Sequence, residues 1–447
     1  MVSIPKGGAQ KLVDMERGLI HRDVFVSPEV YAQELERVFA RAWLFIGHES
    51  QIPNPNDFFV SRMGEESVIM TRDRQGEIHV LLNTCMHRGM KVCRYDQGNT
   101  PVFSCPYHGW SYSTDGNLVS VPGELIGVPQ FATAYHGELE KESWGLVHVP
   151  QMQNYKGSIW ACWDKEAPDF FEYLGDMRYR LDETFDDDVE VVAGVHKWLM
   201  PCNWKFAAEN FQGDFYHGTT THRSVDVVGI SPSGGSGRHL ARSARASQRF
   251  HIAFPQGHGT VGRLLLPGEE LEYSEAYPNN PVVEEYYRAR YYKLQERYKD
   301  QPRPGGGVGT VFPNMSFGGP NGLAVWHPVG AHMTEAWRWY FIEKDAPQEV
   351  RDMLRHYQLR YSGPTGMTEQ DDAENWNYAS YASAGTVARR YPYNYNQGTG
   401  HEHPSESLEG AWTTEVGSTE QNARVLYHRW AQFMDAESWD ELRDPHF

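Results

Sequence analysis

The sequence predicts an α+β protein in which a small all-β domain is followed by a larger domain containing both helices and strands. The 447-residue chain is long enough for two or three domains with their own cores. Short runs rich in β-branched and aromatic residues, separated by Gly, Pro, Asn and Asp, fill residues 43–163. Beyond them, strand-like and helix-like stretches come in separate groups, which is typical of the α+β class.

The first predicted element is a helix from Pro28 to about Ala42. Ser27 is a suitable N-cap, and proline is favoured at the first helical position because its missing N–H is not needed there. The 43–163 domain follows, and turn residues divide it into short segments that we expect to form antiparallel strands. These strands are expected at 58–63, 67–72, 79–83, 101–104, 145–149 and 159–163.

The remainder of the chain begins with a strand at 189–199 and a helix at 204–217. Residues 231–247, rich in Gly, Ser and Arg, have no apolar period and are expected to form a loop. A long amphipathic helix is predicted at 281–299. The last strands are expected at 309–317, 322–328 and 335–343, and the last helices at 347–361, 367–383 and 420–434.

Composition excludes several classes of partner. The net charge of −18 argues against nucleic acid and anionic membranes, because both reward basic surface. No stretch approaches eighteen apolar residues, and the first residues do not resemble a signal peptide. We therefore expect a cytoplasmic protein with no membrane or nucleic-acid partner, and its five cysteines suit a reducing compartment.

Two short Cys/His motifs are the most informative feature of the chain. Cys85-Met86-His87 and Cys105-Pro106-Tyr107-His108 are separated by seventeen residues. Two thiolates on one iron and two imidazoles on the other make a Rieske [2Fe–2S] cluster. The alternative is a structural zinc site, which the same four ligands also satisfy. The motifs favour iron–sulfur, and both fall in predicted loops of the β domain.

A second metal site is indicated by His217 and His222. If the predicted helix ends near Gly218, the chain swings His222 back towards His217. Two histidines and a carboxylate form the facial triad of non-heme ferrous iron. Without a metal, these would be a helix-end and a loop histidine, and the acids a solvated helix N-terminus. The candidate carboxylates are Glu369, Asp371, Asp372 and Glu374.

Taken in order, these motifs resemble the large (α) subunit of the Rieske non-heme iron aromatic-ring-hydroxylating dioxygenases, the naphthalene and biphenyl dioxygenase family. The resemblance covers nearly the whole chain. It includes the segment from Asn210 to His222, the Phe312-Pro313-Asn314 strand, the Trp326-His327-Pro328 element and the segment around Asp372. It implies that residues 1–42 and 164–447 form a catalytic domain, an antiparallel sheet surrounded by helices.

The resemblance also implies the roles of individual residues. Asp214 would bridge a cluster histidine of one subunit and an iron histidine of its neighbour, and Asn210 would lie close to the iron. The cluster would be held by Cys85, His87, Cys105 and His108, and the mononuclear Fe(II) by His217, His222 and Asp372.

Partners and substrate follow from the same resemblance. Electrons from NAD(P)H would arrive through a ferredoxin reductase and a ferredoxin, and a small β subunit would complete an α3β3 hexamer. Both atoms of O2 would be added to an aromatic ring, giving a cis-dihydrodiol. Small residues stand at two positions where family members often have large ones, which favours polycyclic hydrocarbons. The expected pocket residues are Phe211, Phe215, Ser362, Met367 and Thr368.

Two other functions stay open. A Rieske monooxygenase or demethylase would share every metal ligand, and Ser362 and Thr368 would also suit a carboxylated monocyclic aromatic. An electron carrier or zinc-stabilised interaction protein would lack the second metal altogether.

Overall fold

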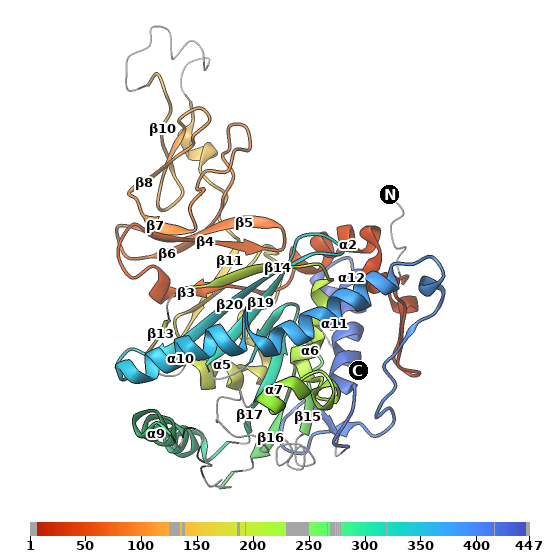
Figure 1. Cartoon of the computed structure of the whole chain (residues 1–447). Helices are drawn as coiled ribbons and strands as arrows, with labels where there is room; N and C mark the ends of the chain where they lie inside the picture. The colour runs from red at the N-terminus through yellow and green to blue at the C-terminus, as the bar shows by residue number, and fades with distance from the viewer. Residues whose placement is uncertain are drawn as a thin grey trace. The chain divides into compact units, whose positions relative to one another are not determined.

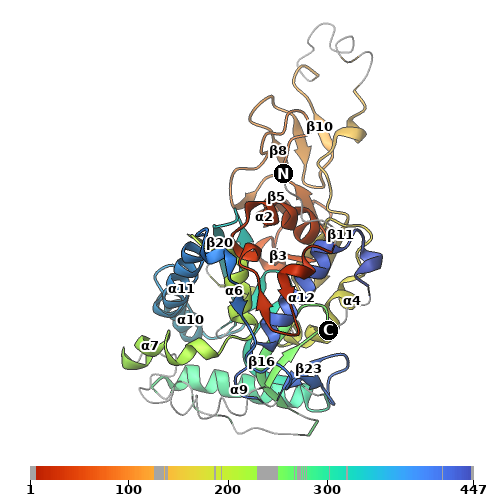
Figure 2. The ribbon, with the colours of Figure 1, turned by 90° about the vertical axis from the view of Figure 1, so that its right-hand side faces the viewer.

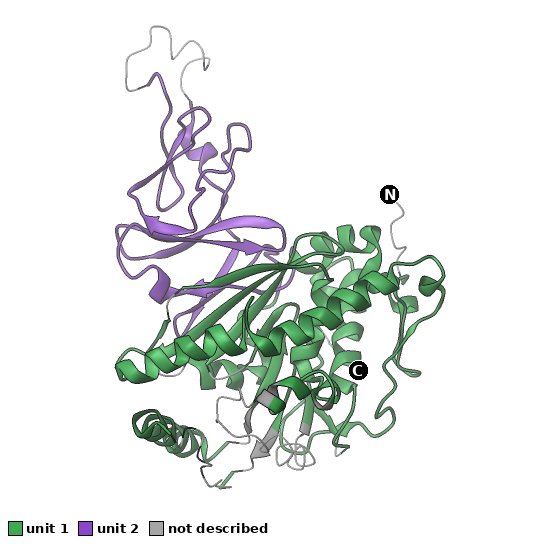
Figure 3. Cartoon of the chain, in the orientation of Figure 1, with its two compact units in different colours: residues 1–39, 168–447 green, residues 40–167 purple. Residues whose placement is uncertain are grey.

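A computed structural model of the chain divides into two compact units, formed by residues 1–39 with 168–447 and by residues 40–167 (Figure 3). The domain expected at 43–163 lies inside the second unit. The expected loop at 231–247 lies outside the described residues. The structure describes residues 7–124, 135, 139–185, 188–192, 194–228, 250–265, 267–268, 273, 275, 277, 279–301, 303–318, 321–414 and 416–443.

The 40–167 unit consists of three antiparallel sheets, with strand orders β6-β5-β4-β7, β10-β9-β8 and β11-β12-β3. Its core places apolar side chains such as Phe58 and Phe103 around Cys85 and Cys105. The prediction of a strand at 145–149 is wrong, because this segment forms only one isolated bridge with β6. The strands are β3 Leu44–His48, β4 Asp57–Met63, β5 Glu66–Arg72, β6 Ile78–Leu82, β7 Gln97–Asn99, β8 Val102–Ser104, β9 Ser111–Ser113, β10 Leu118–Ser120, β11 Gln151–Tyr155 and β12 Ser158–Cys162.

The other unit is built on an antiparallel sheet of order β13-β20-β19-β18-β17-β16-β15-β23-β22, with β14 also paired to β20. A small second sheet joins β1 Val13–Asp14, β2 Leu19–Ile20 and β21 Tyr393–Asn394. The strands of the large sheet are β13 Val189–Val191, β14 His196–Met200, β15 Phe250–Ala253, β16 Gly259–Leu265, β17 Arg303–Val311, β18 Met315–Phe317, β19 Gly322–Pro328, β20 Thr334–Glu343, β22 His403–Pro404 and β23 Trp412–Thr414.

Helices cover both faces of this sheet (Figures 1 and 2). Alternate side chains of β20 point to opposite faces. Tyr340 and Ile342 pack with α10, whereas Phe341 packs on Phe185 of α5, with ring centroids 5.0 Å apart. The helices that matter below are α2 Pro28–Glu34, α5 Arg178–Phe185, α6 Trp204–Gly213, α7 Arg223–Val228, α9 Pro281–Tyr298, α10 Gln348–Tyr361, α11 Met367–Ser383 and α12 Gln421–Asp435.

A buried ion pair fixes the start of α6. Lys205 contacts Glu34 of α2, and both side chains are fully buried. Glu34 also accepts hydrogen bonds from the indole N–H groups of Trp204 (3.1 Å) and Trp430 (2.7 Å). Breaking such a pair by removing one partner leaves an uncompensated buried charge. The network therefore ties α6 to α2 and to α12.

Three expected elements differ from those observed. The N-terminal helix, capped by Ser27 as expected, ends as a π-turn at Phe39 and does not reach Ala42. The expected strand at 189–199 is interrupted and becomes β13 and β14. The strand expected at 309–317 is a hairpin of β17 and β18, because the chain turns at Pro313. By contrast, β19 and α11 have the expected bounds.

Candidate metal centres and active site

The two Cys/His motifs form a pair of loops with the same hydrogen-bond pattern. In each loop the cysteine N–H donates to the carbonyl five residues later, at 2.8 Å in both, and a glycine N–H returns to the cysteine carbonyl at 2.9 Å in both. Those glycines, Gly89 and Gly109, have φ of +69° and +73°, a conformation that favours glycine. The two loops therefore share one backbone conformation around the cysteine, although His87 lies two residues after its cysteine and His108 lies three after.

The four side chains suit a two-iron cluster better than one zinc ion. Cys85 and Cys105 are buried, and the rings of His87 and His108 lie 4.6 Å apart. Among the described residues, Nδ1 of His87 is buried without a hydrogen-bond partner, as expected of a metal ligand. A single zinc ion would draw all four ligand atoms together. No such convergence occurs here, because the described residues contain one compact ligand group, which lies elsewhere.

Aromatic side chains surround the cluster loops. Trp110 stacks on His87, with centroids 5.0 Å apart and planes within 7°. The hydroxyl of Tyr112 lies 3.2 Å from Sγ of Cys85 and accepts a hydrogen bond from the N–H of Met86. With Cys85 as a thiolate, the hydroxyl is the donor of the O–H···S contact. Tyr112 was not singled out from the sequence, although it lies seven residues after Cys105.

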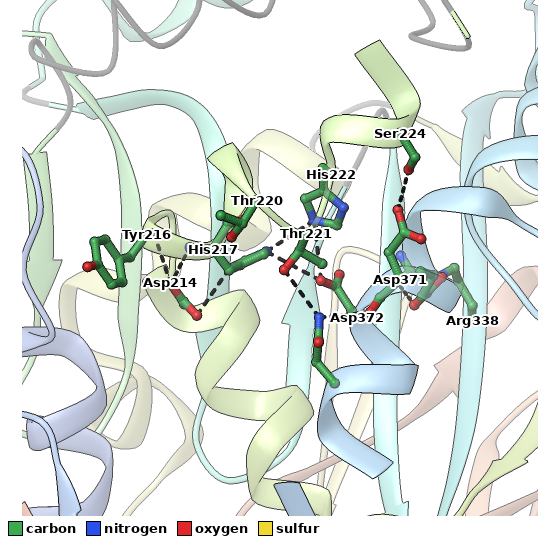
Figure 4. Close-up of polar contacts among 12 residues, drawn as sticks. Asp214, Tyr216, His217, Thr220, Thr221, His222, Ser224, Arg338, Asp371 and Asp372 are labelled. Atoms are coloured by element: carbon green, nitrogen blue, oxygen red, sulfur yellow. Dashed lines mark hydrogen bonds and ion pairs between the residues drawn. The ribbon is translucent and has the colours of Figure 1, made fainter. Parts of the chain in front are cut away.

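The second centre depends on where α6 ends. The helix stops at Gly213 and not at His217 as expected, because Oδ1 of Asp214 accepts the N–H groups of Tyr216 (2.9 Å) and His217 (3.4 Å). This side chain competes with the helical hydrogen bonds. His217 then lies in a short 3-10 helix, and His222 immediately precedes α7. The two histidines face each other, as the sequence predicted (Figure 4).

His217, His222 and Asp372 are the one group of at least three potential metal ligands whose atoms lie within 4.8 Å of one another in the part of the chain that the structure describes. The Nε2 atoms of the histidines are 3.0 Å apart, and each is 3.3 Å from Oδ1 of Asp372 (Figure 4). If these three side chains held a metal ion, its remaining coordination positions would be available to other ligands. This donor set fits ferrous iron of the two-histidine, one-carboxylate type.

Electrostatics at this centre favour a bound cation. Burial raises the pKa of Asp372 to about 7, although His217 opposes the shift. Burial acts to lower the pKa of His217, but the contact of its Nδ1 with Asp214, at 3.0 Å, and the charge of Asp372 outweigh it and raise the pKa. A divalent ion bound between these side chains would lower the pKa of Asp372 and keep its carboxylate ionised.

The other acid of the pair points away from the ligand group. Oδ2 of Asp371 accepts a hydrogen bond from Ser224 of α7, at 2.7 Å (Figure 4). Asn375 links the carbonyl of Asp371 (3.0 Å) to the hydroxyl of Thr221 (3.2 Å). Asp371 and Asn375 therefore contact residues on either side of His222 without belonging to the ligand group.

The expected pocket residues are only partly brought together. Phe211 packs on Trp326, with centroids 5.2 Å apart, and both Ser362 and Thr368 are buried. Met367 begins α11 and is 38% exposed, so it does not share their buried environment. Phe215 is half-buried, and Asn210 lies in the last turn of α6, where its carbonyl accepts the N–H of Asp214 at 3.1 Å.

A buried ion pair next to Phe211 was not singled out from the sequence. Arg338 of β20 pairs with Glu369 of α11, and its guanidinium carbon lies 5.3 Å from the ring centre of Phe211. The signal was present in the sequence, because Arg338 is a lone charge in the apolar run from Ala336 to Ile342.

A chain with a cage for a [2Fe–2S] cluster and a triad for mononuclear iron belongs to the class of two-centre iron oxidoreductases. Residues 42–131 match the Rieske [2Fe-2S] domain, and residues 172–411 match the ring hydroxylating alpha subunit (catalytic domain). The chain belongs to the ring-hydroxylating dioxygenase α subunits. It is an oxidoreductase that carries a Rieske cluster and a mononuclear iron, uses O2, and depends on NAD(P)H through partner proteins, as in this family.

Individual relatives agree with this assignment. Biphenyl 2,3-dioxygenase subunit alpha of Rhodococcus jostii (strain RHA1) is 38% identical over 97% of this chain and 92% of that protein. The N,N-dimethyl phenylurea N-demethylase subunit alpha of Sphingobium sp. (strain YBL2) is 31% identical over 89% and 87%. The crystal structure of naphthalene 1,2-dioxygenase from Rhodococcus sp. bound to indole superposes with a TM-score of 0.80, at 33% identity, covering 97% and 100% of the chains.

Proposed function

We propose that this protein adds both atoms of O2 to one face of an aromatic ring in compounds with two or more rings, giving a cis-dihydrodiol. The observation that carries the proposal is the convergence of His217, His222 and Asp372 in a chain of this family. Relatives named for biphenyl and naphthalene support a substrate of this size.

We propose the following metal ligands and the residues that orient them. The cluster is held by Cys85, His87, Cys105 and His108, and the iron by His217, His222 and Asp372. When bound, the cluster supplies electrons singly and the ferrous iron activates O2. Asp214 orients the ring of His217 through Nδ1, which leaves Nε2 for the metal. Asn210 and Phe211, at the end of α6, border the site where the ring would lie, and Phe215 extends the aromatic wall.

We further propose that Asp214 connects two subunits. One of its oxygens contacts His217, while 43% of its side chain is exposed and accessible to a second protein chain. We propose His108 of a neighbouring copy as the second partner, in an α3β3 assembly with a small β subunit. A ferredoxin and its reductase would deliver electrons. A cytoplasmic location suits these partners and the five cysteines, none of which forms a disulfide. In the described residues no helix is long and apolar enough to cross a bilayer.

Labelled oxygen tests the proposed reaction. The holoenzyme, supplied with ferredoxin, reductase and NAD(P)H, is given 18O2 and a panel of one- to four-ring aromatics. We expect cis-dihydrodiols with two labelled oxygens, and the highest turnover on substrates with at least two rings. Preferred turnover of benzoate-like substrates would favour the carboxylated monocyclic alternative.

A second function has one specific observation in its favour, the similarity to an N-demethylase α subunit. That reaction would insert one labelled oxygen into a methyl C–H bond and send the other to water; the hydroxymethyl group then leaves as labelled formaldehyde, so the demethylated product carries no label. An N-methylated phenylurea included in the panel distinguishes the two reactions directly.

A further inference from the structure

A cluster of polar side chains is buried beside the proposed substrate site, where an apolar lining would be expected. It combines neighbouring strands, since His196 of β14 lies opposite Arg338 of β20. Gly363, in the loop before α11, is so close to His196 that a Cβ there would lie 3.1 Å from Nδ1. We call the following residues the polar cluster: His196, Arg338, Tyr340, Ser362, Thr368 and Glu369.

The charges of the polar cluster balance. Arg338 is 1% exposed and Glu369 is 4% exposed, and the guanidinium contacts one carboxylate oxygen of Glu369. The other oxygen accepts the N–H of Gly363 at 2.7 Å. The positive charge of Arg338 is therefore already neutralised within the protein. A ligand that carried its own negative charge would meet Glu369 as well as Arg338, so the pair disfavours a carboxylate.

Several buried polar atoms of this region have no partner among the described residues. They include Nε of Arg338, Oγ1 of Thr368, Nδ1 of His196 and Nε2 of Gln358. Arg338, Thr368 and Gln358 are each more than nine-tenths buried. Burying a polar group without a partner costs about 1–3 kcal/mol, so such groups are normally satisfied by water or by a ligand. This region of the protein is therefore suited to a small group with hydrogen-bonding atoms.

The position of the polar cluster connects it to the reacting ring. Glu369 precedes Asp372 by three residues on α11, so the two side chains share a helix face. Arg338 lies over the ring of Phe211, one residue beyond Asn210. A ring placed against Phe211 near the triad would thus extend towards the polar cluster.

We infer that the polar cluster binds a neutral hydrogen-bonding substituent, a hydroxyl or carbonyl group, on the part of the substrate farthest from the metal. The inference rests on the proposed function and narrows its substrate class to aromatic compounds bearing such a group. Ser362 and Thr368 are its specificity residues, because both are buried, Oγ1 of Thr368 has no partner among the described residues, and Ser362 interacts with Tyr340 of the same cluster.

Calorimetric binding to the holoenzyme tests the inference without turnover. The probes are biphenyl, 4-hydroxybiphenyl and biphenyl-4-carboxylate. We expect 4-hydroxybiphenyl to bind about tenfold more tightly than biphenyl, the equivalent of one net hydrogen bond, and the carboxylate to bind more weakly than either. Equal affinity for biphenyl and 4-hydroxybiphenyl, or tightest binding of the carboxylate, would overturn the inference.

Variants show which residues produce the preference for 4-hydroxybiphenyl over biphenyl. Ser362→Ala and Thr368→Val should each reduce several-fold the ratio of the affinity for 4-hydroxybiphenyl to the affinity for biphenyl. The double variant Arg338→Met/Glu369→Gln removes both charges together and should abolish the preference. The matched control is Thr365→Val in the same loop, where the side chain is exposed and the preference should be retained.

The outcomes separate this inference from the proposed reaction. A preference that persists in both single variants contradicts it, even if the double variant fails to fold. If the hydroxylated probe binds preferentially but none of the probes becomes a dihydrodiol, the proposed reaction fails and the binding inference stands. If all probes are oxygenated but bind equally, only the inference fails.

Discussion

The Tyr112 hydroxyl lies 3.2 Å from Sγ of Cys85, where it can influence the reduction potential of the cluster. Hydrogen bonds to cluster sulfurs raise the potential because they stabilise the more negative, reduced form. Tyr112→Phe removes this donor, together with the acceptor of the Met86 N–H, so the potential should fall by tens of millivolts, on the order of 40 mV for about 1 kcal/mol. Protein-film voltammetry measures the change. An unchanged potential would mean that the contact carries no hydrogen bond to the thiolate.

The adjacent acids Asp371 and Asp372 provide a test of the proposed iron ligands. Asp372→Ala removes one of three ligands and should reduce the mononuclear iron to near zero while the coloured cluster remains. His217→Ala and His222→Ala should act in the same way. Asp371→Ala is the matched control, because its side chain bonds to Ser224, and it should retain the iron. Metal analysis with optical spectra of the cluster distinguishes these results. Iron loss in the Asp371 variant alone would reverse the assignment.

Between strands β15 and β16, His258 makes part of the fold sensitive to acid. It is fully buried, its Nδ1 accepts the N–H of Phe312, and its Nε2 donates to the carbonyl of Tyr173, each at 2.9 Å. Burial lowers the pKa of His258 from 6.5 to about 4, with Arg429 adding to the effect. The folded protein therefore binds this proton less readily than the unfolded chain does.

The stabilisation from neutral His258 is complete above pH 6.5 and is lost as the pH falls from there to about 4. At about 1.4 kcal/mol per pH unit, the loss amounts to about 3 kcal/mol. Urea unfolding of the parent and of His258→Asn at several pH values checks this. The variant should be less stable at pH 7 but should lose less stability between pH 6.5 and 4. Parallel pH profiles would contradict the assignment.

Sequence patterns predicted elements well where local signals agreed, and less well where the hydrogen bonds of one side chain or a partner distant in sequence decide the structure. The helix α11 and the strand β19 were predicted with the observed bounds, because Gly366 directly precedes the helix and the apolar run from Leu323 to Trp326 marks the strand. The predicted end of α6 was wrong, because the side chain of Asp214 accepts hydrogen bonds from the next backbone N–H groups. Helical propensity takes no account of such hydrogen bonds. The pair Arg338–Glu369 spans 31 residues, and its pairing depends on how α11 packs on β20.

At the level of the whole assembly, Asp214→Ala tests the proposed contact between subunits. The variant loses the carboxylate that orients His217, and such losses typically cost 10- to 100-fold in activity or metal affinity. We expect turnover to fall at least 100-fold while the cluster is still reduced by ferredoxin and both metals remain. Stopped-flow reduction of the cluster, compared with product formation, separates the two steps. Full activity of the enzyme as a monomer would exclude a role between subunits.

The buried network of Glu34, Lys205 and Trp430 determines the order in which the two units fold while the chain is being synthesised. Its partners are separated by 171 and 396 residues, and Asp435 also accepts the N–H of Ala9, at 2.9 Å. The unit containing these residues thus lacks its last contacts until α12 has left the ribosome, whereas the 40–167 unit is one continuous segment. Because domains fold as units and the N-terminal ones fold first, the cluster-binding unit becomes native while residues 1–39 still await their partners. Ribosomes stalled before residue 421 should therefore carry a protease-resistant 40–167 segment and a protease-sensitive N-terminus.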